Sequence, residues 1–310
     1  MRYGITRDIA TLDDLVEISE AEYQRIVHAH HSLVEVLLLE ENFDLVTENY
    51  YEYELELISI ALRHMVFHGP SDASFGSERR AIVRRIVNLL TACRMYLDQC
   101  GHHISEIYGS ESSHTTEVKS EKSSQYDQCF GYRVMEALRN HVQHRGFPVH
   151  VLTVSWQWQD IEDEARRRLH HTVIPSIRVA ELVSGGKFKQ AVLEEMQNVN
   201  SDGALDIRPL VRDYISGIGM IHERIRKLCS SDVVEWENIL NGAIEQFQER
   251  YGEEESLLGL VVVAVQDDRH WAERIPILKE LSERRNRLLT KNRWFENLNK
   301  RIASNEIRQT

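Results

Sequence analysis

The sequence predicts a mainly α-helical protein: an antiparallel helical bundle with a small β-hairpin or strand insertion and a C-terminal helical region. Two observations predict this fold class. Apolar residues recur at steps of three or four through most of the chain, which is the period of an α-helix. The 310 residues include only 5 prolines and 15 glycines, too few for a fold of many short strands. We expect a bundle with an acidic N-terminal segment over residues 1–148, and a mostly helical accessory region over residues 149–310.

The first part of the bundle is predicted as two helical stretches. Residues 12–42 form a helix with an acidic face, whose apolar stripe comprises Leu33, Val34, Leu37 and Leu38. Residues 48–67 also favour a helix, although apolar and acidic residues alternate from Tyr51 to Leu57 as they do in a strand. Both interpretations of this alternation stay open. Gly69-Pro70 ends the element.

Residues 78–108 give the clearest helix, with Ser77 as its expected N-cap. Its apolar stripe comprises Ile82, Ile86, Leu89, Cys93, Leu97, Cys100, Ile104 and Ile107. Residues 109–124 are polar and serine-rich, which predicts a mobile loop. A second helix is expected from about residue 125 to Gly146 and Pro148, with an apolar face of Tyr126, Phe130, Val134 and Leu138. The loop should bring the two helices together as antiparallel neighbours.

Residues 149–158 and 258–265 are the predicted strands. In the first stretch successive residues alternate between two faces, and the second stretch is a short apolar run, so we expect the two to pair in a small sheet or hairpin. The rest of the chain after residue 160 is expected to be helical, at about 160–182, 187–197, 207–229, 232–251 and 270–305.

The net charge of −12 is unevenly distributed along the chain. Residues 1–60 hold 14 acidic and three basic residues, so this segment alone carries −11, and the other 250 residues carry −1. A strongly acidic chain argues against extensive wrapping of nucleic acid. Because the acidity belongs to the N-terminal segment, the remaining chain is free to form local basic patches.

The cysteines and the apolar runs indicate a cytoplasmic protein without a membrane association. Cys93, Cys100, Cys129 and Cys229 form no CxxC pair and are expected to be free, buried thiols of a reducing compartment. The first residues lack the apolar core of a signal peptide. The longest apolar run, residues 257–265, is about half the length of a membrane span.

One segment concentrates residues suited to phosphodiester chemistry: Arg139-Asn140-His141-Val142-Gln143-His144-Arg145-Gly146. Histidine can gain and lose a proton near neutral pH, as a general acid or base must. The planar guanidinium of arginine binds phosphate and stays charged while negative charge builds up in the transition state. RNA supplies its own nucleophile, the 2′-hydroxyl, so this chemistry requires no metal and no other cofactor.

This segment resembles the Arg-x(4–6)-His motif of the HEPN superfamily (higher eukaryotes and prokaryotes nucleotide-binding). The match consists of Arg139, the asparagine directly after it and His144, on a helix that glycine and proline end. The resemblance covers about residues 78–148. It implies a helical bundle that forms a homodimer and acts as a metal-independent endoribonuclease in toxin–antitoxin or antiviral (phage-defence) systems, with RNA as substrate and an antitoxin or other protein as a further partner.

The resemblance also implies roles for individual residues. Arg139 would contact the scissile phosphate, Asn140 would orient the site and His144 would be the general acid or base, while His141 and Arg145 would bind substrate. On a regular helix Arg139 and His144 lie about 140° apart, because each residue advances the helix by about 100°. They would converge only if the helix loosened before Gly146 or if a second protomer supplied one of them.

Two other interpretations stay open. The segment could be a solvated helix end, with His144 favoured there by the helix dipole, and the protein a non-catalytic dimerisation or scaffold module. The histidine pairs lack the carboxylate or cysteine spacing of a zinc site, so we expect no metal. The arginine runs 79–80, 84–85 and 166–168 are either solvated faces or contacts to an RNA backbone.

Overall fold

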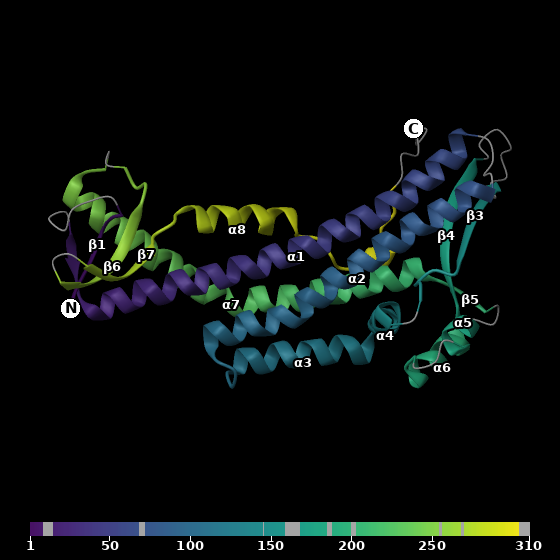
Figure 1. The fold of residues 1–310 in the computed structure, drawn as a ribbon, viewed down its shortest axis with the longest axis horizontal. Helices are drawn as coiled ribbons and strands as arrows, with labels where there is room; N and C mark the ends of the chain where they lie inside the picture. Colours follow the sequence, from purple (N-terminus) through teal and green to yellow (C-terminus); the bar gives the residue numbers. More distant parts are fainter. Residues whose placement is uncertain are drawn as a thin grey trace. The chain divides into compact units, whose positions relative to one another are not determined.

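The computed structural model describes residues 1–8, 15–67, 72–144, 146–158, 168–184, 188–199, 203–253, 256–267 and 270–303. The prediction of a mainly helical fold is confirmed (Figure 1). The helices are α1 (Glu20–Val66), α2 (Asp72–Tyr108), α3 (Ser113–Gln128), α4 (Phe130–His144), α5 (Val179–Ser184), α6 (Gln190–Val199), α7 (Ile207–Tyr251), α8 (Glu280–Lys291) and the 3-10 turn η3 (Leu298–Lys300). The strands are β1 (Arg2–Arg7), β2 (Val16–Ile18), β3 (Val151–Trp158), β4 (Leu169–Arg178), β5 (Ala204–Asp206), β6 (Leu260–Asp267) and β7 (His270–Pro276).

The chain forms two compact units, and each is assembled from three separate stretches. Unit 1 comprises residues 1–42, 99–118 and 223–293, and unit 2 comprises residues 43–98, 119–222 and 294–310. The helices α1, α2 and α7 each contribute residues to both units. The division into units therefore does not follow the boundary near residue 148 that the sequence suggests.

Unit 1 contains a four-stranded antiparallel sheet in the order β2-β1-β6-β7. Strand β6 lies between β1 and β7, and its Val261, Val263 and Val265 form a buried cluster with Leu15 packed against it. This inner position explains the longest apolar run of the sequence, because an inner strand covered on both faces excludes polar residues. The second sheet, β3-β4-β5, is also antiparallel and belongs to unit 2.

The strand partners correct one prediction. The expected pairing of 149–158 with 258–265 is wrong, because β3 pairs with β4, from Val151↔Ser176 to Trp158↔Leu169, while β6 pairs with β1 and β7. Residues 169–178, predicted as helix, form strand β4, which is largely exposed at its start and buried from Pro175 to Ile177. Closing a short loop between neighbouring segments costs less conformational entropy than closing a long one, so β3 pairs with the nearer β4 rather than with β6.

Other boundaries differ from the predicted ones. Residues 2–7 and 16–18 are strands, so the first helix begins at Glu20 and continues without a break to Val66. Ser77 lies inside α2 rather than at its N-cap. The helices predicted at 207–229 and 232–251 are one helix, α7, and residues 270–276 are a strand. The predicted stop at Gly69-Pro70 and residues 159–167 lie outside the described residues.

The stretch predicted as a mobile loop, 109–124, is mostly helix α3. Gly109 has a φ of 90°, a conformation that glycine adopts readily, and reverses the chain after α2. Ser112 then caps the new helix by accepting a hydrogen bond from the Thr115 N–H at 3.2 Å. Lys122 of α3 donates to the Leu97 carbonyl, so α3 runs back along α2 (Figure 1). The serines of this stretch cap the helix and cover its polar face. Composition alone does not distinguish such a helix from a serine-rich loop.

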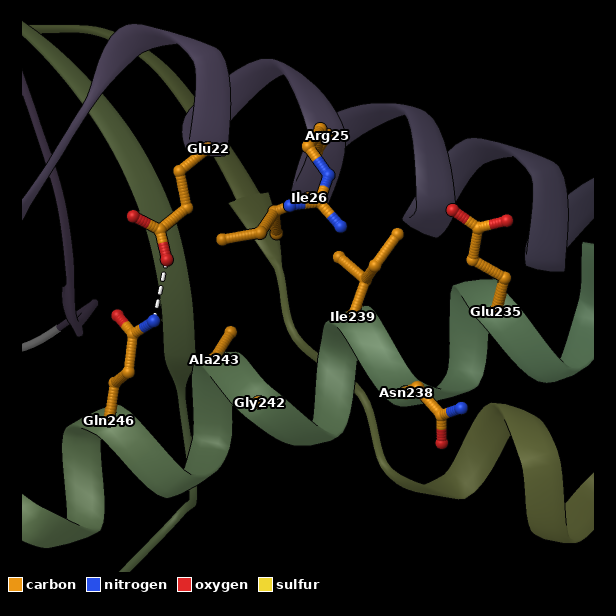
Figure 2. Close-up of a pocket in the computed structure, with 9 residues that line it drawn as sticks. All are labelled: Glu22, Arg25, Ile26, Glu235, Asn238, Ile239, Gly242, Ala243 and Gln246. Carbon is orange, nitrogen blue, oxygen red and sulfur yellow. Dashed lines mark hydrogen bonds between the residues drawn. The ribbon is translucent and has the colours of Figure 1, made fainter.

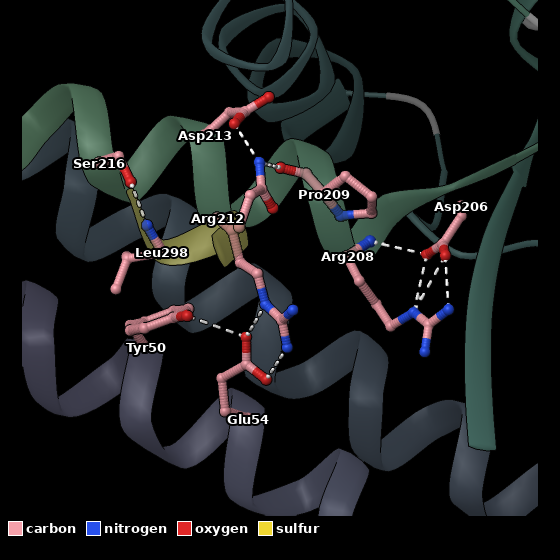
Figure 3. A network of polar contacts seen from close by, with 10 residues as sticks. Tyr50, Glu54, Asp206, Arg208, Pro209, Arg212, Asp213, Ser216 and Leu298 are labelled. Atoms are coloured by element: carbon pink, nitrogen blue, oxygen red, sulfur yellow. Dashed lines mark hydrogen bonds and ion pairs between the residues drawn. The ribbon is translucent and has the colours of Figure 1, made fainter. Parts of the chain in front are cut away.

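Polar contacts fix α1 and the C-terminal segment to α7 within unit 2 (Figure 3). The Arg212 guanidinium donates to both carboxylate oxygens of Glu54, at 2.8 and 2.9 Å, and the Tyr50 hydroxyl donates to the same carboxylate at 2.9 Å. The hydrogen bonds to Glu54 raise the pKa of Arg212. In the C-terminal segment the Leu298 N–H donates to the Ser216 hydroxyl at 3.3 Å.

Close packing of α4 against α7 gives the first prediction. A Cβ on Gly131 would lie 2.6 Å from the Asp213 Cβ and 3.0 Å from the Leu210 carbonyl oxygen, both on α7. We expect Gly131→Ala to lower the free energy of unfolding by about 1–3 kcal/mol, because two helix backbones must separate. Gly242→Ala is the matched control: it has no atom within 4 Å of its added Cβ and should raise stability by about 0.5–1 kcal/mol. Urea unfolding of both variants measures the difference, and equal effects would contradict it.

No described helix is long and apolar enough to cross a membrane.

Candidate functional site at the end of helix α4

Helix α4 is fixed on one side, and this determines which of its residues reach the surface. Val134 and Leu138 are fully buried. Glu136 contacts both neighbouring helices: its carboxylate accepts a hydrogen bond from Tyr214 of α7 at 2.5 Å and lies 3.9 Å from the Arg94 guanidinium of α2. The apolar and the tethered positions together set the rotation of α4, so Asn140, Gln143 and His144 near its end point to solvent.

The structure leaves Asn140 and His144 exposed on this last turn. They are four residues apart, so they lie on one side of the helix. Arg139 is partly buried and donates from Nη1 to the Gln143 amide oxygen at 3.2 Å, while its buried Nε has no hydrogen-bond partner among the described residues. Helix α4 continues to His144 without loosening, so Arg139 and His144 of one chain are not brought together.

The two residues expected to bind substrate have different outcomes. His141 is 8% exposed and packs against Phe188, with ring centroids 5.9 Å apart. It therefore belongs to the packing between α4 and the segment before α6 rather than to the exposed face. Arg145 lies outside the described residues.

A polar cluster beside the chain that leaves α4 was missed in the sequence. His150 precedes β3, and its Nδ1 accepts a hydrogen bond from the Arg178 N–H at 3.1 Å, while its Nε2 lies 3.7 Å from the Glu181 carboxylate. Arg79 of α2 donates to the neighbouring Val149 carbonyl at 3.4 Å. Burial lowers the pKa of His150, and the nearby Arg178 and Arg79 lower it further, whereas Glu181 opposes them. The members come from three distant places in the chain, so no sequence motif identifies the cluster.

This cluster gives a pH-dependent prediction. Because folding lowers the pKa of His150, the unfolded chain binds more protons just below about pH 6.5, and the contribution of His150 to stability is lost as the pH falls through this window. We expect His150→Asn, which keeps an acceptor for the Arg178 N–H, to unfold with a flatter pH dependence between about pH 5.5 and 7.5. His102→Asn is the control, since the His102 side chain is 66% exposed. If wild type and His150→Asn showed the same pH dependence of stability, His150 would not be the group responsible for it.

The arginines of α2 divide into anchored and exposed members. Arg79 is engaged with Val149, and Arg85 contacts the carboxylates of Glu52 and Glu56 on α1. Arg80 and Arg84 are exposed. The contacts Arg94–Glu136 and Arg79–Val149 show that α2 and α4 run antiparallel, with Arg84 in register with the end of α4. The third run is outside the described residues except for Arg168.

Metal and thiol chemistry find little support in the described part of the chain. No group of three or more histidine, cysteine or carboxylate side chains there could hold a metal ion. All four cysteines are free, and Cys93, Cys100 and Cys229 are buried as the sequence predicts, whereas Cys129 is only partly buried. Burial raises the pKa of the Cys229 thiol to about 11 and raises that of Cys129 as well, which disfavours the reactive thiolate.

A pocket of about 280 Å³ lies in unit 1, between the first turns of α1 and the second half of α7 (Figure 2). Gln246 donates to the Glu22 carboxylate at 2.5 Å across it, and Arg25 and Glu235 also line it. None of the residues singled out in the sequence lines this pocket. It is smaller than typical ligand sites, and we assign it no function.

The chain matches no family model, no curated protein and no solved structure.

Proposed function

We propose that the protein is a metal-independent endoribonuclease of the HEPN type, and that the end of α4 is its catalytic surface. The observation that carries the proposal is the exposure of Asn140 and His144 on one side of a helix whose opposite side is fixed in the core. A catalytic acid or base must be accessible to substrate and held by a rigid element, and the last turn of α4 meets both requirements.

In the proposed reaction the 2′-hydroxyl oxygen of RNA attacks the adjacent phosphorus, and the bond from phosphorus to the 5′-oxygen breaks. His144 takes the proton of the 2′-hydroxyl or gives a proton to the leaving 5′-oxygen, and Asn140 orients the phosphate. Arg139 neutralises the charge that builds up on the phosphate oxygens. The products are a 2′,3′-cyclic phosphate and a 5′-hydroxyl end, so no water and no cofactor is consumed in this step.

A regular α4 separates Arg139 from His144, so the site is composed from two copies of the chain. The exposed Arg80 and Arg84 extend the basic surface beyond the motif and contact the RNA backbone. Such an enzyme acts in the cytoplasm as a toxin or phage-defence effector, held inactive by an antitoxin or another protein partner.

The proposal is tested with RNA and with the same sequence carrying 2′-O-methyl groups, both in EDTA. We expect cleavage of RNA alone, with a 2′,3′-cyclic phosphate on the product, and loss of cleavage in Arg139→Ala and in His144→Ala. Cleavage of the blocked substrate would indicate a different nucleophile. Absence of cleavage by wild type on any RNA tested, or full activity of both variants, would overturn the proposal.

The second candidate function is a non-catalytic helical scaffold, which the separation of Arg139 from His144 favours. Expression in cells distinguishes the two functions. A scaffold should be harmless, whether it carries His144 or alanine at that position. Toxicity of wild type that the single substitution His144→Ala removes would exclude the scaffold.

A further inference from the structure

The second half of α1 has two apolar faces. Its inner face is buried in unit 2, where Tyr53, Leu57 and Ile60 are at most 6% exposed. Its outer face carries five large apolar side chains that are 47–60% exposed; we call them the outer stripe, which comprises Tyr51, Leu55, Ile58, Leu62 and Met65. A helix that is apolar on opposite sides normally buries both of them.

The ambiguous alternation in the sequence is the origin of this arrangement. In the helix, Tyr51 and Leu55 lie on the outer face, whereas Tyr53 and Leu57 lie on the inner face. An apolar residue at every second position therefore produces two apolar stripes, each with members four residues apart. Residues 51–57 are helical, so their strand-like alternation of apolar residues indicates that the helix has a second apolar surface to bury.

The outer stripe cannot turn inward, because the inner side of α1 is held by ion pairs. Arg212 of α7 binds both oxygens of Glu54 (Figure 3), and Arg85 of α2 contacts Glu52 and Glu56. Rotating α1 would break these contacts and expose the core. The outer stripe is therefore a permanent feature of the surface.

We propose that the outer stripe binds the outer stripe of a second copy of the chain, with the two helices antiparallel about a two-fold axis at Ile58. Steps of four, three, four and three residues are the repeat of a two-helix seam. The axis sets Tyr51 against Met65, Leu55 against Leu62 and Ile58 against its own copy. Every member of the stripe then meets an apolar residue, as an isologous interface requires.

The charges beside the stripe favour the antiparallel direction. Glu52 and Arg63 flank the stripe on the same side of the helix, and the Glu52 side chain is 45% exposed although it contacts Arg85. The axis at Ile58 brings Glu52 of each copy opposite Arg63 of the other. In a parallel pair each of these side chains would instead face the other flank of the partner helix, so Glu52 and Arg63 would not meet and their pairing would be lost.

The area is sufficient for a specific contact. The exposed half of each stripe side chain contributes roughly 80–100 Å², so two stripes with their flanking residues bury about 1,000 Å² in total, the lower bound for a stable interface. The contact leaves the motif face free, because α2 and α7 lie between α1 and α4: each of them contacts Glu136 of α4 and a carboxylate of α1. The inference is thus independent of the endoribonuclease proposal.

The test is the mass of the full-length chain by sedimentation equilibrium. We expect the double variant Leu55→Glu/Leu62→Glu to have half the mass of wild type with an unchanged circular dichroism spectrum. Met220→Glu is the matched control, since Met220 is 46% exposed on α7 and lies outside the stripe. It should keep the wild-type mass. A monomeric wild type, or an unchanged mass in the double variant, would overturn the proposal.

Charge variants test the direction of pairing and do not depend on disrupting apolar contacts. Arg63→Glu should weaken association by about tenfold or more, because two acidic pairs then face each other. Glu52→Arg combined with Arg63→Glu should restore most of it. Ile58→Cys should in addition be joined to its own copy by a short bifunctional thiol reagent, which the control Met220→Cys should not be. Failure of the combined variant to recover together with no crosslink at residue 58 would refute the antiparallel register.

Discussion

Replacing His144 by alanine is expected to lower the rate of RNA cleavage by about 10²–10⁴-fold, the usual contribution of a general acid or base. The side chain is exposed at the end of α4, so its removal should change the free energy of unfolding by less than about 0.5 kcal/mol. Loss of activity in a protein of unchanged stability would therefore report chemistry rather than folding.

His102→Ala is the matched control, since the His102 side chain is also exposed on a helix and lies far from the motif in the sequence. Cleavage rates are measured in EDTA at several pH values for both variants. The wild-type rate should rise and fall with pH if His144 exchanges a proton, and the residual rate of His144→Ala should lose one limb of that profile. Equal rates for the two histidine variants would remove His144 from the mechanism.

Replacing Arg226 by methionine is expected to lower the free energy of unfolding by about 3–5 kcal/mol. The Glu40 side chain is 2% exposed, and Arg226 donates to both of its carboxylate oxygens, at 2.9 and 2.5 Å. Arg226 also donates to the Asn292 carbonyl at 2.9 Å, so it joins α1, α7 and the end of α8 within unit 1. Without the guanidinium, the buried Glu40 carboxylate loses its main partner. The cost of removing this carboxylate from water is then no longer offset, and this lowers stability.

The double variant Glu40→Leu/Arg226→Met should regain most of the lost stability, because an apolar pair removes the uncompensated charge. Arg2→Ala is the surface comparison: the Arg2–Glu17 pair is 53% and 64% exposed, and its loss should cost less than about 1 kcal/mol. Urea unfolding of the four proteins decides the matter. A double variant no more stable than Arg226→Met would show that the unpaired Glu40 carboxylate is not the cause of the lost stability.

The helices that the sequence predicts well are those whose apolar periodicity has a single interpretation. In α2 the stripe from Ile82 to Ile104 is buried as expected, because about six turns of regular spacing exclude a strand. Helix α3 was missed because its only fully buried apolar residue is Val118, and its stability depends on a cap and on contacts with α2. Strand β4 was missed because its polar residues, such as His170 and His171, are not those that favour a strand.

The candidate site shows the same limits. Local spacing identifies Arg139, Asn140 and His144, and it also predicts the separation that the regular α4 has. The burial of His141 depends on Phe188, which is 47 residues away, and local spacing carries no information about it. The cluster around His150 depends on packing of α2, β4 and α5 for the same reason.

The acidic N-terminal segment has a consequence for the order in which the protein folds. Two of its carboxylates pair with cations late in the chain, Glu40 with Arg226 and Glu41 with Arg284, and strand β1 pairs with β6 more than 250 residues away. Contacts between such distant residues slow folding, since the intervening chain must be closed into a loop first. During synthesis Glu40, Glu41 and strand β1 remain without these partners until the ribosome has passed residue 284. Unit 1 therefore completes its folding only after its last stretch, residues 223–293, has been synthesised, and its exposed apolar strands need protection until then.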